Sequence, residues 1–392
     1  MPASFRHLSP AARVYCGTDC LQNLTAELRR MECRRAVVFC GKTLAHHPLG
    51  LALVCAALED RFAGAYTRVA RHSPLAQVIA GAETLRQLNA DAVIALGGGS
   101  AIVTARASSI LLAEGPDIHR LCTQFPSGKP PLSPKLLHAK LPQLVIPSTP
   151  STAIAKAGSA VLDQQLGRRL ALFDPKTRAA AVFIHPDILL TASPQLAMGS
   201  SLQAFAAAVQ GIESRIRDPF ADALLIHALR LLGQFLPRLL RDPMDADVRV
   251  QLMVGALLAG QGSDYAPSGL ASAMAHCVGA RFEQENGVTS AVVLPHAMRF
   301  NAGVVGDRLA LIAEALGKPR AGNVAATADM AVAAVEELLA GLGTPRRLRD
   351  IAVTADALPQ LAEDIAADWF LHQNPRRVNG AAEVVELLRA AW

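Results

Sequence analysis

The chain has 392 residues, of which 51% are hydrophobic and 18% charged, and its formal net charge at pH 7 is +5. This composition excludes a disordered chain, and the length favours two or three domains with well-buried cores. The modest charge and the 4% of aromatic residues argue against nucleic acid as a partner, and a small acidic substrate or cofactor suits them better.

The sequence also gives expectations about cellular location. No stretch reaches about 18 apolar residues without a charge or a breaker, and the first residues lack the apolar core of a signal peptide. The seven cysteines are scattered and show no paired spacing of a zinc site, which predicts reduced thiols. We therefore expect a cytoplasmic protein that does not contact a membrane.

The first half of the chain alternates strand and helix patterns. Strands are expected at 13–15, 35–40, 64–69, 91–96, 141–147 and 180–186, with helices at 21–31, 51–62, 75–88 and 101–112. Such alternation predicts a parallel, doubly wound sheet of the Rossmann type, whose ligand lies beyond the carboxyl ends of the strands.

The most informative stretch is the apolar run that ends in Gly97, Gly98, Gly99 and Ser100 and continues as a helix. Glycines allow a diphosphate to approach the backbone N–H groups, and the helix dipole and the serine hydroxyl favour its negative charge. A plain strand-to-helix turn has the same local pattern, so the motif alone leaves both interpretations open.

Two further strand ends are candidates for cofactor contacts. The end at Gly41 and Lys42 carries no carboxylate that would repel a ribose phosphate, which permits NADP, although Lys42 can equally be a solvated surface residue. The strand at 141–147 is followed by the hydroxyls of Ser148, Thr149 and Thr152, which can bond to phosphate or to a nicotinamide carboxamide.

Two segments interrupt the alternation. A proline-rich excursion over residues 115–140, with Pro126, Pro130, Pro131 and Pro134, is either a functional flap or a surface insertion, and its length favours the insertion. Residues 158–173 have the pattern of an antiparallel hairpin or edge pair.

From residue 193 onward the strand patterns disappear. Helices are expected at 200–213, 221–240, 245–258, 271–279, 309–316, 325–340, 358–367 and 381–392. The predicted fold class is therefore α/β plus all-α. We expect a nucleotide-binding α/β domain at residues 1–187 and a helical domain at residues 188–392.

These signals occur in the order of one known family. The Gly-Gly-Gly-Ser turn, the Pro-Ser-Thr at 147–149, His276-Cys277-Val278-Gly279, the run Ala291–Ala297, Phe300-Asn301 and Asn374-Pro375-Arg376 carry the likeness. With them the chain resembles the iron-containing alcohol dehydrogenase superfamily, which has a dehydroquinate synthase-like fold. It is most similar to the maleylacetate reductase branch.

The resemblance also shows where this chain departs from the family. The family's metal is held by an aspartate and a histidine on the first helix of the second domain and by two later histidines. The matching positions here are Gln203, Ala207, Ser272 and Asn286. None of the four is a good ligand for a divalent cation, so no metal is expected.

On the cofactor side, the resemblance implies NADH or NADPH as the cofactor. The family's usual lysine after the glycine turn is Arg106 here, which keeps a positive charge near a diphosphate, and Lys156 follows the hydroxyl cluster.

The function that the resemblance implies is a metal-independent, NAD(P)H-dependent oxidoreductase. It would reduce a carbonyl or a conjugated double bond of a small, carboxylated substrate in the cleft between the domains. His276 matches the family histidine that lines this cleft without holding the metal, and we expect it to be the general acid, with Lys156 and Asn286 as oxyanion partners. The alternative is a non-redox enzyme or a nucleotide-sensing protein. The resemblance also implies a homodimer.

Overall fold

The computed structural model describes Phe5, residues 7–125 and residues 131–392. Its contacts divide the chain into an α/β unit, Ser9–Ser193, and a helical unit that comprises Pro194–Trp392 together with His7 and Leu8. His7 belongs to the helical unit because its Nδ1 lies 2.6 Å from Oδ2 of Asp218. The expected domain limits at 187 and 188 stay a prediction.

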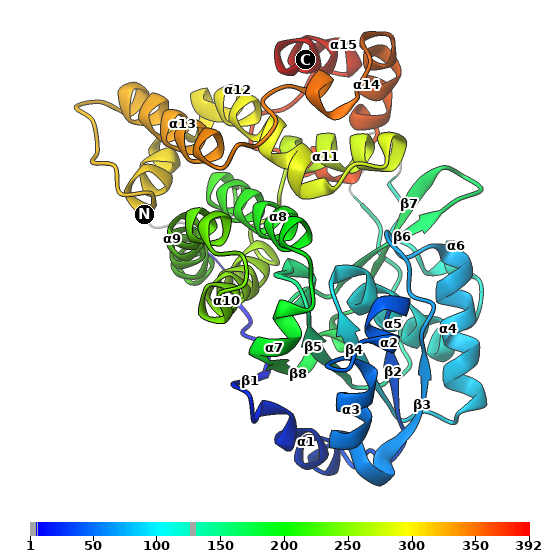
Figure 1. Cartoon of the computed structure of the whole chain (residues 1–392). Helices are drawn as coiled ribbons and strands as arrows, with labels where there is room; N and C mark the ends of the chain where they lie inside the picture. The colour runs from blue at the N-terminus through cyan, green and yellow to red at the C-terminus, as the bar shows by residue number, and fades with distance from the viewer. Residues whose placement is uncertain (1–4, 6, 126–130) are drawn as a thin grey trace. The chain divides into compact units, whose positions relative to one another are not determined.

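The α/β unit contains a six-stranded sheet, in the order β1-β8-β5-β4-β2-β3, in which every pair of neighbours is parallel (Figure 1). The strands are β1 (Arg13–Cys16), β2 (Ala36–Phe39), β3 (Phe62–Tyr66), β4 (Ala92–Gly97), β5 (Gln143–Pro147) and β8 (Ala179–Ile184). The central strands β2, β4 and β5 are buried throughout, which explains their unbroken apolar sequences. The predicted parallel sheet is confirmed.

Helices cover both faces of this sheet, since alternate residues of a strand point to opposite sides. The helical segments are η1 (Cys20–Asn23), α1 (Leu24–Arg30), α2 (Lys42–His46), α3 (Leu51–Leu58), η2 (Glu59–Arg61), α4 (Leu75–Gln87), α5 (Gly99–Glu114), α6 (Ile118–Leu121), η3 (Thr152–Ile154), η4 (Pro175–Thr177) and α7 (Pro186–Leu190). Ile94 and Leu96 of β4 pack in one core with α1, α3 and α7, while α5 packs against α4.

The direction in which the chain adds strands to the sheet reverses between β2 and β4. From β2 the chain builds β3 outward, and then β4, β5 and β8 are added on the other side of β2. In open α/β sheets the crevice at the carboxyl ends of two such strands is the usual place for a ligand. Gly41 follows β2 and Gly98 follows β4, so both lie at this crevice.

The hairpin and the proline-rich excursion lie outside the main sheet. Strands β6 (Gly158–Asp163) and β7 (Arg168–Phe173) pair antiparallel, as predicted. The excursion includes α6 and a bridge between Gln124 and Leu132, and its end is anchored by Lys140, whose side chain is fully buried. Pro126 and Pro130 lie outside the described residues.

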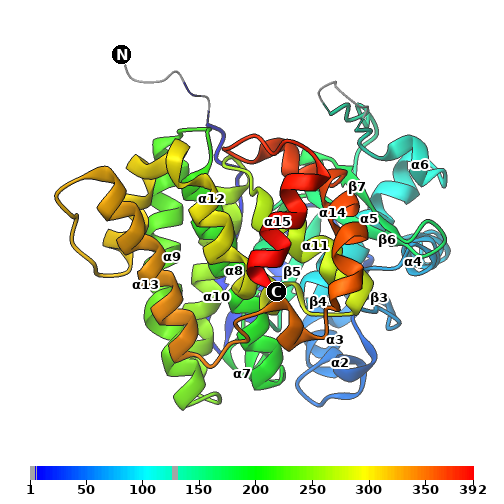
Figure 2. The same cartoon turned by 90° about the horizontal axis from the view of Figure 1, so that it is seen from above.

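The described part of the helical unit is built from helices alone, as predicted. These are α8 (Pro194–Glu213), α9 (Pro219–Arg241), α10 (Ala246–Ser263), α11 (Leu270–Phe282), α12 (Asn286–Ala315), α13 (Val324–Gly341), η5 (Leu348–Ile351), η6 (Ala355–Ala357), α14 (Leu358–Ala366), η7 (Trp369–Gln373) and α15 (Ala381–Ala391). Figure 2 shows α8, α9, α10 and α12 packed side by side. Their buried side chains form one continuous core.

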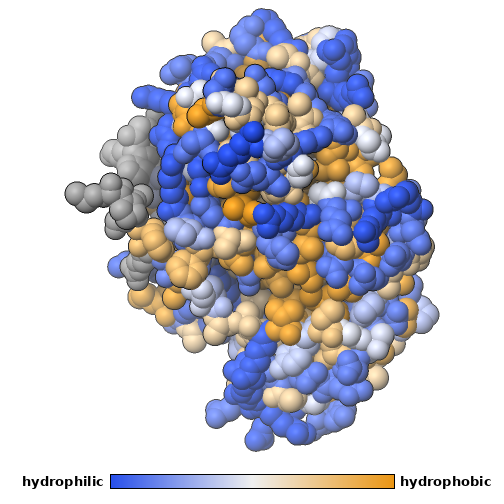
Figure 3. All heavy atoms as spheres, turned by 90° about the vertical axis from the view of Figure 1, so that its left-hand side faces the viewer, coloured by the Kyte–Doolittle hydropathy of each residue, from blue (hydrophilic) through white to orange (hydrophobic). Residues whose placement is uncertain are grey.

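One helix of this unit, α9, is long and apolar enough to cross a membrane by length and composition. Its residues Leu225, Leu229, Leu232 and Leu236 are, however, fully buried in the core shared with α8 and α10. We therefore interpret α9 as a core helix. On the face drawn in Figure 3, hydrophobic residues gather in the middle among hydrophilic ones.

The sequence underestimated α12. A helix was expected only at 309–316, whereas α12 begins at Asn286, passes through Pro295 and has non-helical dihedral angles at Val305. Proline removes a hydrogen bond and normally stops or kinks a helix. Here Val293, Leu294, Ala297 and the other apolar residues around Pro295 are buried against the core, and this packing outweighs the lost bond.

Candidate functional site

The glycine turn joins β4 to the start of α5. Gly97 has φ +142°, which favours glycine, and Gly98 is the N-cap of the 16-residue helix. A Cβ at Gly98 would lie 2.6 Å from Oγ1 of Thr149, and one at Gly99 would lie 3.1 Å from Oγ of Ser151. A side chain at either position would therefore have to displace a hydroxyl of the neighbouring segment, and the turn presents the N-terminal N–H groups of a long helix at the switch point of the sheet. These features fit a dinucleotide diphosphate.

The predicted hydroxyl cluster lies directly beside this turn. Strand β5 pairs with β4 in register, and the backbone N–H of Ser148 donates to the carbonyl of Gly97 over 3.1 Å. Ser148 and Thr149 are buried, and Thr152 begins the short helix η3. The structure therefore brings Ser148 and Thr149 next to the glycine turn, as expected from adjacent parallel strands.

Gly41 and Lys42 lie at the end of β2, the other neighbour of β4. Gly41 is the N-cap of the five-residue helix α2, and Lys42 is its exposed first residue. A Cβ at Gly97 would lie 3.7 Å from Leu44 of this helix, so the two strand ends are adjacent. Their role in cofactor binding stays a prediction.

Arg106 does not have the surroundings that the resemblance implied. Its guanidinium is fully buried and donates to the carbonyls of Gly158 over 2.8 Å and of Ala153 over 2.9 Å. It therefore ties α5 to the segment that carries Thr152, and its charge is directed at backbone carbonyls.

His276 is paired with a carboxylate that the sequence did not reveal. On α11, His276 is 6% exposed, and its Nδ1 lies 2.6 Å from Oδ2 of Asp368, which is 8% exposed. Oδ1 of Asp368 accepts from the N–H of Phe370 over 2.9 Å, and the ring of Trp369 packs edge-on at 4.5 Å from the imidazole. Where Nδ1 carries the proton of this hydrogen bond, the carboxyl oxygen of Asp368 accepts it.

No local pattern could have identified Asp368, because 92 residues separate it from His276. Its only distinguishing signal is an acidic residue before two aromatics, a short way upstream of Asn374-Pro375-Arg376.

Asn286 and Lys156 belong to different units. Asn286 is the first residue of α12, and a Cβ at Gly279 would lie 2.5 Å from its Oδ1. Because Gly279 follows His276 by about one turn of α11, Asn286 lies against the face that carries His276. Lys156 is half-buried between η3 and β6 in the α/β unit. The roles of all three residues stay predictions.

The four positions that match the family's metal ligands carry neutral side chains. Two of these side chains are hydrogen-bonded to other residues of the protein. Oε1 of Gln203 accepts from Ser290 over 3.0 Å, and Oγ of Ser272 accepts from Nε2 of Gln210 over 3.0 Å. Ala207 has no donor atom, and Asn286 offers one amide oxygen. Within the described ranges, no group of three or more His, Cys, Asp or Glu side chains is placed to hold a metal ion. These residues do not fit an iron or zinc ion.

A network of buried polar side chains lies at the start of α11. Oε1 of Gln210 accepts from the N–H groups of Gly269 and Ser272 over 3.1 and 3.0 Å, and Oδ1 of Asn374 accepts from that of Leu270 over 2.9 Å. These side chains satisfy the first N–H groups of the helix that carries His276. The Asn-Pro-Arg motif is therefore a capping element for α11.

Glu213 extends this network. Its side chain is 1% exposed, and Oε2 accepts from Nδ2 of Asn301 over 3.2 Å, while Asn301 and Asn374 bond to each other. Burial raises the pKa of Glu213 to about 8, and the bond from Asn301 opposes this shift only in part. A pKa about one unit above neutral predicts that Glu213 is mostly protonated at pH 7.

Two family models together cover almost the whole chain. Residues 11–186 match the iron-containing alcohol dehydrogenase model, and residues 197–392 match the C-terminal model of the Fe-containing alcohol dehydrogenase family.

Two curated relatives are distant but cover nearly the whole chain. Lactaldehyde reductase of Escherichia coli (strain K12) is 29% identical over 96% of this chain and 97% of its own length. Maleylacetate reductase 2 of Cupriavidus pinatubonensis is also 29% identical, over 97% of this chain and 94% of its own.

Solved structures share the fold. A 1,3-propanediol oxidoreductase covers 100% of both chains with a TM-score of 0.90 at 21% identity. The maleylacetate reductase from Agrobacterium tumefaciens covers 100% of this chain and 98% of its own with a TM-score of 0.80 at 23% identity. The chain belongs to the iron-containing alcohol dehydrogenase family, and the relatives named here are reductases and an oxidoreductase.

Proposed function

We propose that the protein is an NAD(P)H-dependent reductase that converts a carbonyl or a conjugated double bond of a small carboxylated substrate without a metal ion. The observation that carries this proposal is the glycine turn at the switch point of the sheet, where Gly98 and Gly99 lie close to the hydroxyls of Thr149 and Ser151 at the N-terminus of α5. Relatives named maleylacetate reductase and NAD-dependent methanol dehydrogenase support the cofactor and the reaction type.

The side chains at the metal-ligand positions support metal independence. A metal ion would polarise the carbonyl, and a site of amide, methyl and hydroxyl groups cannot hold one tightly. The charge that develops on the substrate oxygen then has to be neutralised by proton donors of the protein.

We assign this work to His276. Nε2 donates its proton to the developing alkoxide, while Asp368 holds Nδ1–H and stabilises the imidazolium before transfer. Asn286 and Lys156 are the proposed partners of the same oxygen. A bound nicotinamide supplies the hydride, so that carbonyl, hydride and proton together give the alcohol.

A second candidate function has its own supporting observation. All four metal-ligand positions have changed type, as expected if the protein had left redox chemistry and become a non-redox enzyme or a nucleotide-sensing protein. Titration with NADH and NADPH distinguishes these alternatives. Binding without turnover favours a nucleotide-sensing protein, and no nucleotide binding favours a non-redox enzyme.

Three finer expectations remain proposals. NAD and NADP are both open, because the end of β2 carries no acidic residue and Lys42 is exposed. The homodimer is suggested by the resemblance. The cytoplasmic location rests on the sequence alone.

The test is His276→Ala, measured by single-turnover oxidation of NADH or NADPH with maleylacetate or a related oxo acid. We expect turnover to fall about 100-fold, the contribution of a positioned general acid, with little change in cofactor affinity. His227→Ala, on the exposed side of α9, is the matched control. A His276→Ala variant that turns over as fast as the parent would remove this residue from the chemistry, and a parent that never oxidises the cofactor would favour the second candidate.

A further inference from the structure

A pocket of about 450 Å³ opens in the α/β unit, far from the strand ends that carry the glycine turn. Its walls include Arg13, the first residue of β1, and Ala180, near the start of β8. Both residues lie at the amino ends of parallel strands, whereas Gly98 follows the carboxyl end of β4. The pocket is therefore at the opposite edge of the sheet and is separate from the proposed cofactor site.

The lining of this pocket is positively charged. Five of its ten residues are cations, and no carboxylate is among them: Arg13, Arg30, Lys140, Lys176 and Arg178. They come from four separate chain segments, so the folded structure gathers them. The volume is within the range of sites for small metabolites.

The carboxylates that pair with these cations are buried behind the wall. Glu27 is 1% exposed and bonds to Arg13 over 2.8 Å and to Arg30 over 2.7 Å. Burial alone would raise the pKa of Glu27, but the bonds from Arg30, Tyr15 and Arg13 lower it to about 2. Glu27 thus holds the two guanidinium groups in place while 55% and 42% of their side-chain surface stays exposed.

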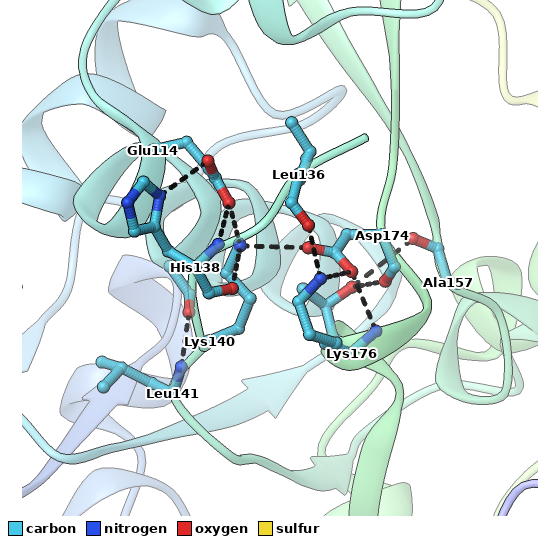
Figure 4. A network of polar contacts seen from close by, with 10 residues as sticks. Glu114, Leu136, His138, Lys140, Leu141, Ala157, Asp174 and Lys176 are labelled. Carbon is cyan, nitrogen blue, oxygen red and sulfur yellow. Dashed lines mark hydrogen bonds and ion pairs between the residues drawn. The ribbon is translucent and has the colours of Figure 1, made fainter. Parts of the chain in front are cut away.

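The other wall is fixed in the same way (Figure 4). Nζ of Lys140 lies 2.5 Å from Oε1 of Glu114 and 3.1 Å from Oδ2 of Asp174, and its side chain is fully buried. Nζ of Lys176 lies 3.0 Å from the other oxygen of Asp174, with 43% of its side chain exposed. Lys140 is therefore structural. Nζ of Lys176 also donates to the carbonyl of Leu136 over 2.6 Å, which leaves one of its three N–H donors for a ligand.

We propose that this pocket binds a small dianion, a phosphate monoester or a dicarboxylate, as a second site independent of the proposed reductase activity. A guanidinium has five N–H donors, and the bonds described here use one of them on Arg13 and two on Arg30. Donors preorganised on a buried carboxylate can bind a second anion with little loss of side-chain entropy. The hydrophobic part of the lining, Met31 and Pro142, fits the carbon skeleton of such a ligand.

The experiment is isothermal titration calorimetry of the full chain with inorganic phosphate and, separately, with succinate, at pH 7.5 and low salt. The glycine turn could also bind phosphate, so both titrations are repeated with Gly98→Val, which should keep the pocket's binding. We expect the double variant Arg13→Gln/Arg178→Gln to lose at least about tenfold in affinity, since two ligand contacts disappear.

The matched control is Arg86→Gln/Arg120→Gln, which removes two exposed cations of the same unit outside the pocket and should change affinity less than about twofold. The single variant Arg178→Gln, which leaves Glu27 paired, serves if the double variant does not fold. Tighter binding of phosphate or of succinate identifies the class of dianion. Absence of binding by both probes, loss of binding in Gly98→Val, or an equal loss in the control would overturn the proposal.

Discussion

The carboxylate of Asp368 is bonded at both oxygens, one to His276 and the other to the N–H of Phe370. This arrangement fixes the orientation of the imidazole and decides which of its nitrogens faces outward from the pair. If His276 is the proton donor, as proposed, the stability of its imidazolium sets how readily it becomes protonated, so we propose Asp368 as a positioning residue for His276.

Asp368→Asn should separate this role from a purely structural one. Asn keeps the oxygen that caps η7, but it carries no charge to stabilise the imidazolium. We expect kcat to fall about 100-fold, the alkaline limb of the pH–rate profile, where the general acid loses its proton, to move to lower pH, and cofactor affinity to stay unchanged. Asp364→Asn, on the exposed face of α14, is the control. An unchanged pH profile with normal kcat would contradict the assignment.

Glu213 predicts a pH dependence of stability. Its pKa is about 8 in the folded protein against an ordinary value of 4.5, so the folded state binds more protons between these pH values. The free energy of unfolding should therefore fall as the pH rises from about 5 to 8, by at most about 1.4 kcal/mol per pH unit.

Glu213→Gln removes this titration, and urea unfolding at pH 5.5, 6.5 and 7.5 measures it. The free energy of unfolding of the variant should fall less steeply with pH than that of the parent. Relative to the parent, the variant should therefore be more stable at pH 7.5 than at pH 5.5. Glu386→Gln, at an exposed position of α15, should leave the slope of the parent. Equal slopes for the parent and Glu213→Gln would show that Glu213 is ionised in the folded state.

At the scale of single elements, α5 organises the α/β unit. Its first turn forms the candidate anion site, and further along Arg106 bonds to the carbonyls of Ala153 and Gly158. The helix thus positions the glycine turn and the hydroxyl segment together. A cofactor bound at the turn would meet two elements whose relative position is set by one buried side chain.

Gly98→Val tests the first turn of α5. The new Cβ would come within 2.6 Å of Thr149 Oγ1 and would occupy the space over the N–H groups. We expect cofactor affinity to fall at least about tenfold in a fluorescence titration, with a smaller effect on folding, because Thr149 can rotate. Gly322→Val, at an exposed position where nothing lies within 4 Å of a new Cβ, serves as control. Equal losses of affinity and of melting temperature would make the turn merely structural.

At the scale of the whole molecule, the chain keeps the architecture of the iron-containing alcohol dehydrogenase family. It has other residue types at the four positions that the resemblance assigns to the metal ligands. The core of the helical unit is continuous. At two of the metal-ligand positions, Gln203 and Ser272 form hydrogen bonds with other side chains. Apolar packing and the capping of α11 hold these helices together.

Metal content follows from this. We expect elemental analysis of the purified protein to find less than about 0.1 iron or zinc ion per chain, since neutral oxygens bind these ions weakly. The variant Gln203→Asp/Ala207→His/Ser272→His/Asn286→His, which restores the ligand types that the resemblance implies, should gain one ion. A parent that carries about one ion per chain would refute metal independence.

The sequence by itself determined the parallel sheet, the glycine turn, the hairpin and the series of helices. These features depend on local patterns: unbroken apolar strands, helical periodicity, and glycines at a strand end. It failed where packing outweighs local preference, as in α12, which continues through Pro295.

Only the tertiary structure decided which side chains meet. The pairs His276–Asp368 and Glu213–Asn301 join residues 92 and 88 positions apart, and the cationic pocket draws on four segments. No periodicity links such residues, because their contact depends on how whole helices and strands pack. Burial is likewise a property of the folded chain. It raises the pKa of Glu213, and it places the guanidinium of Arg106 against backbone carbonyls.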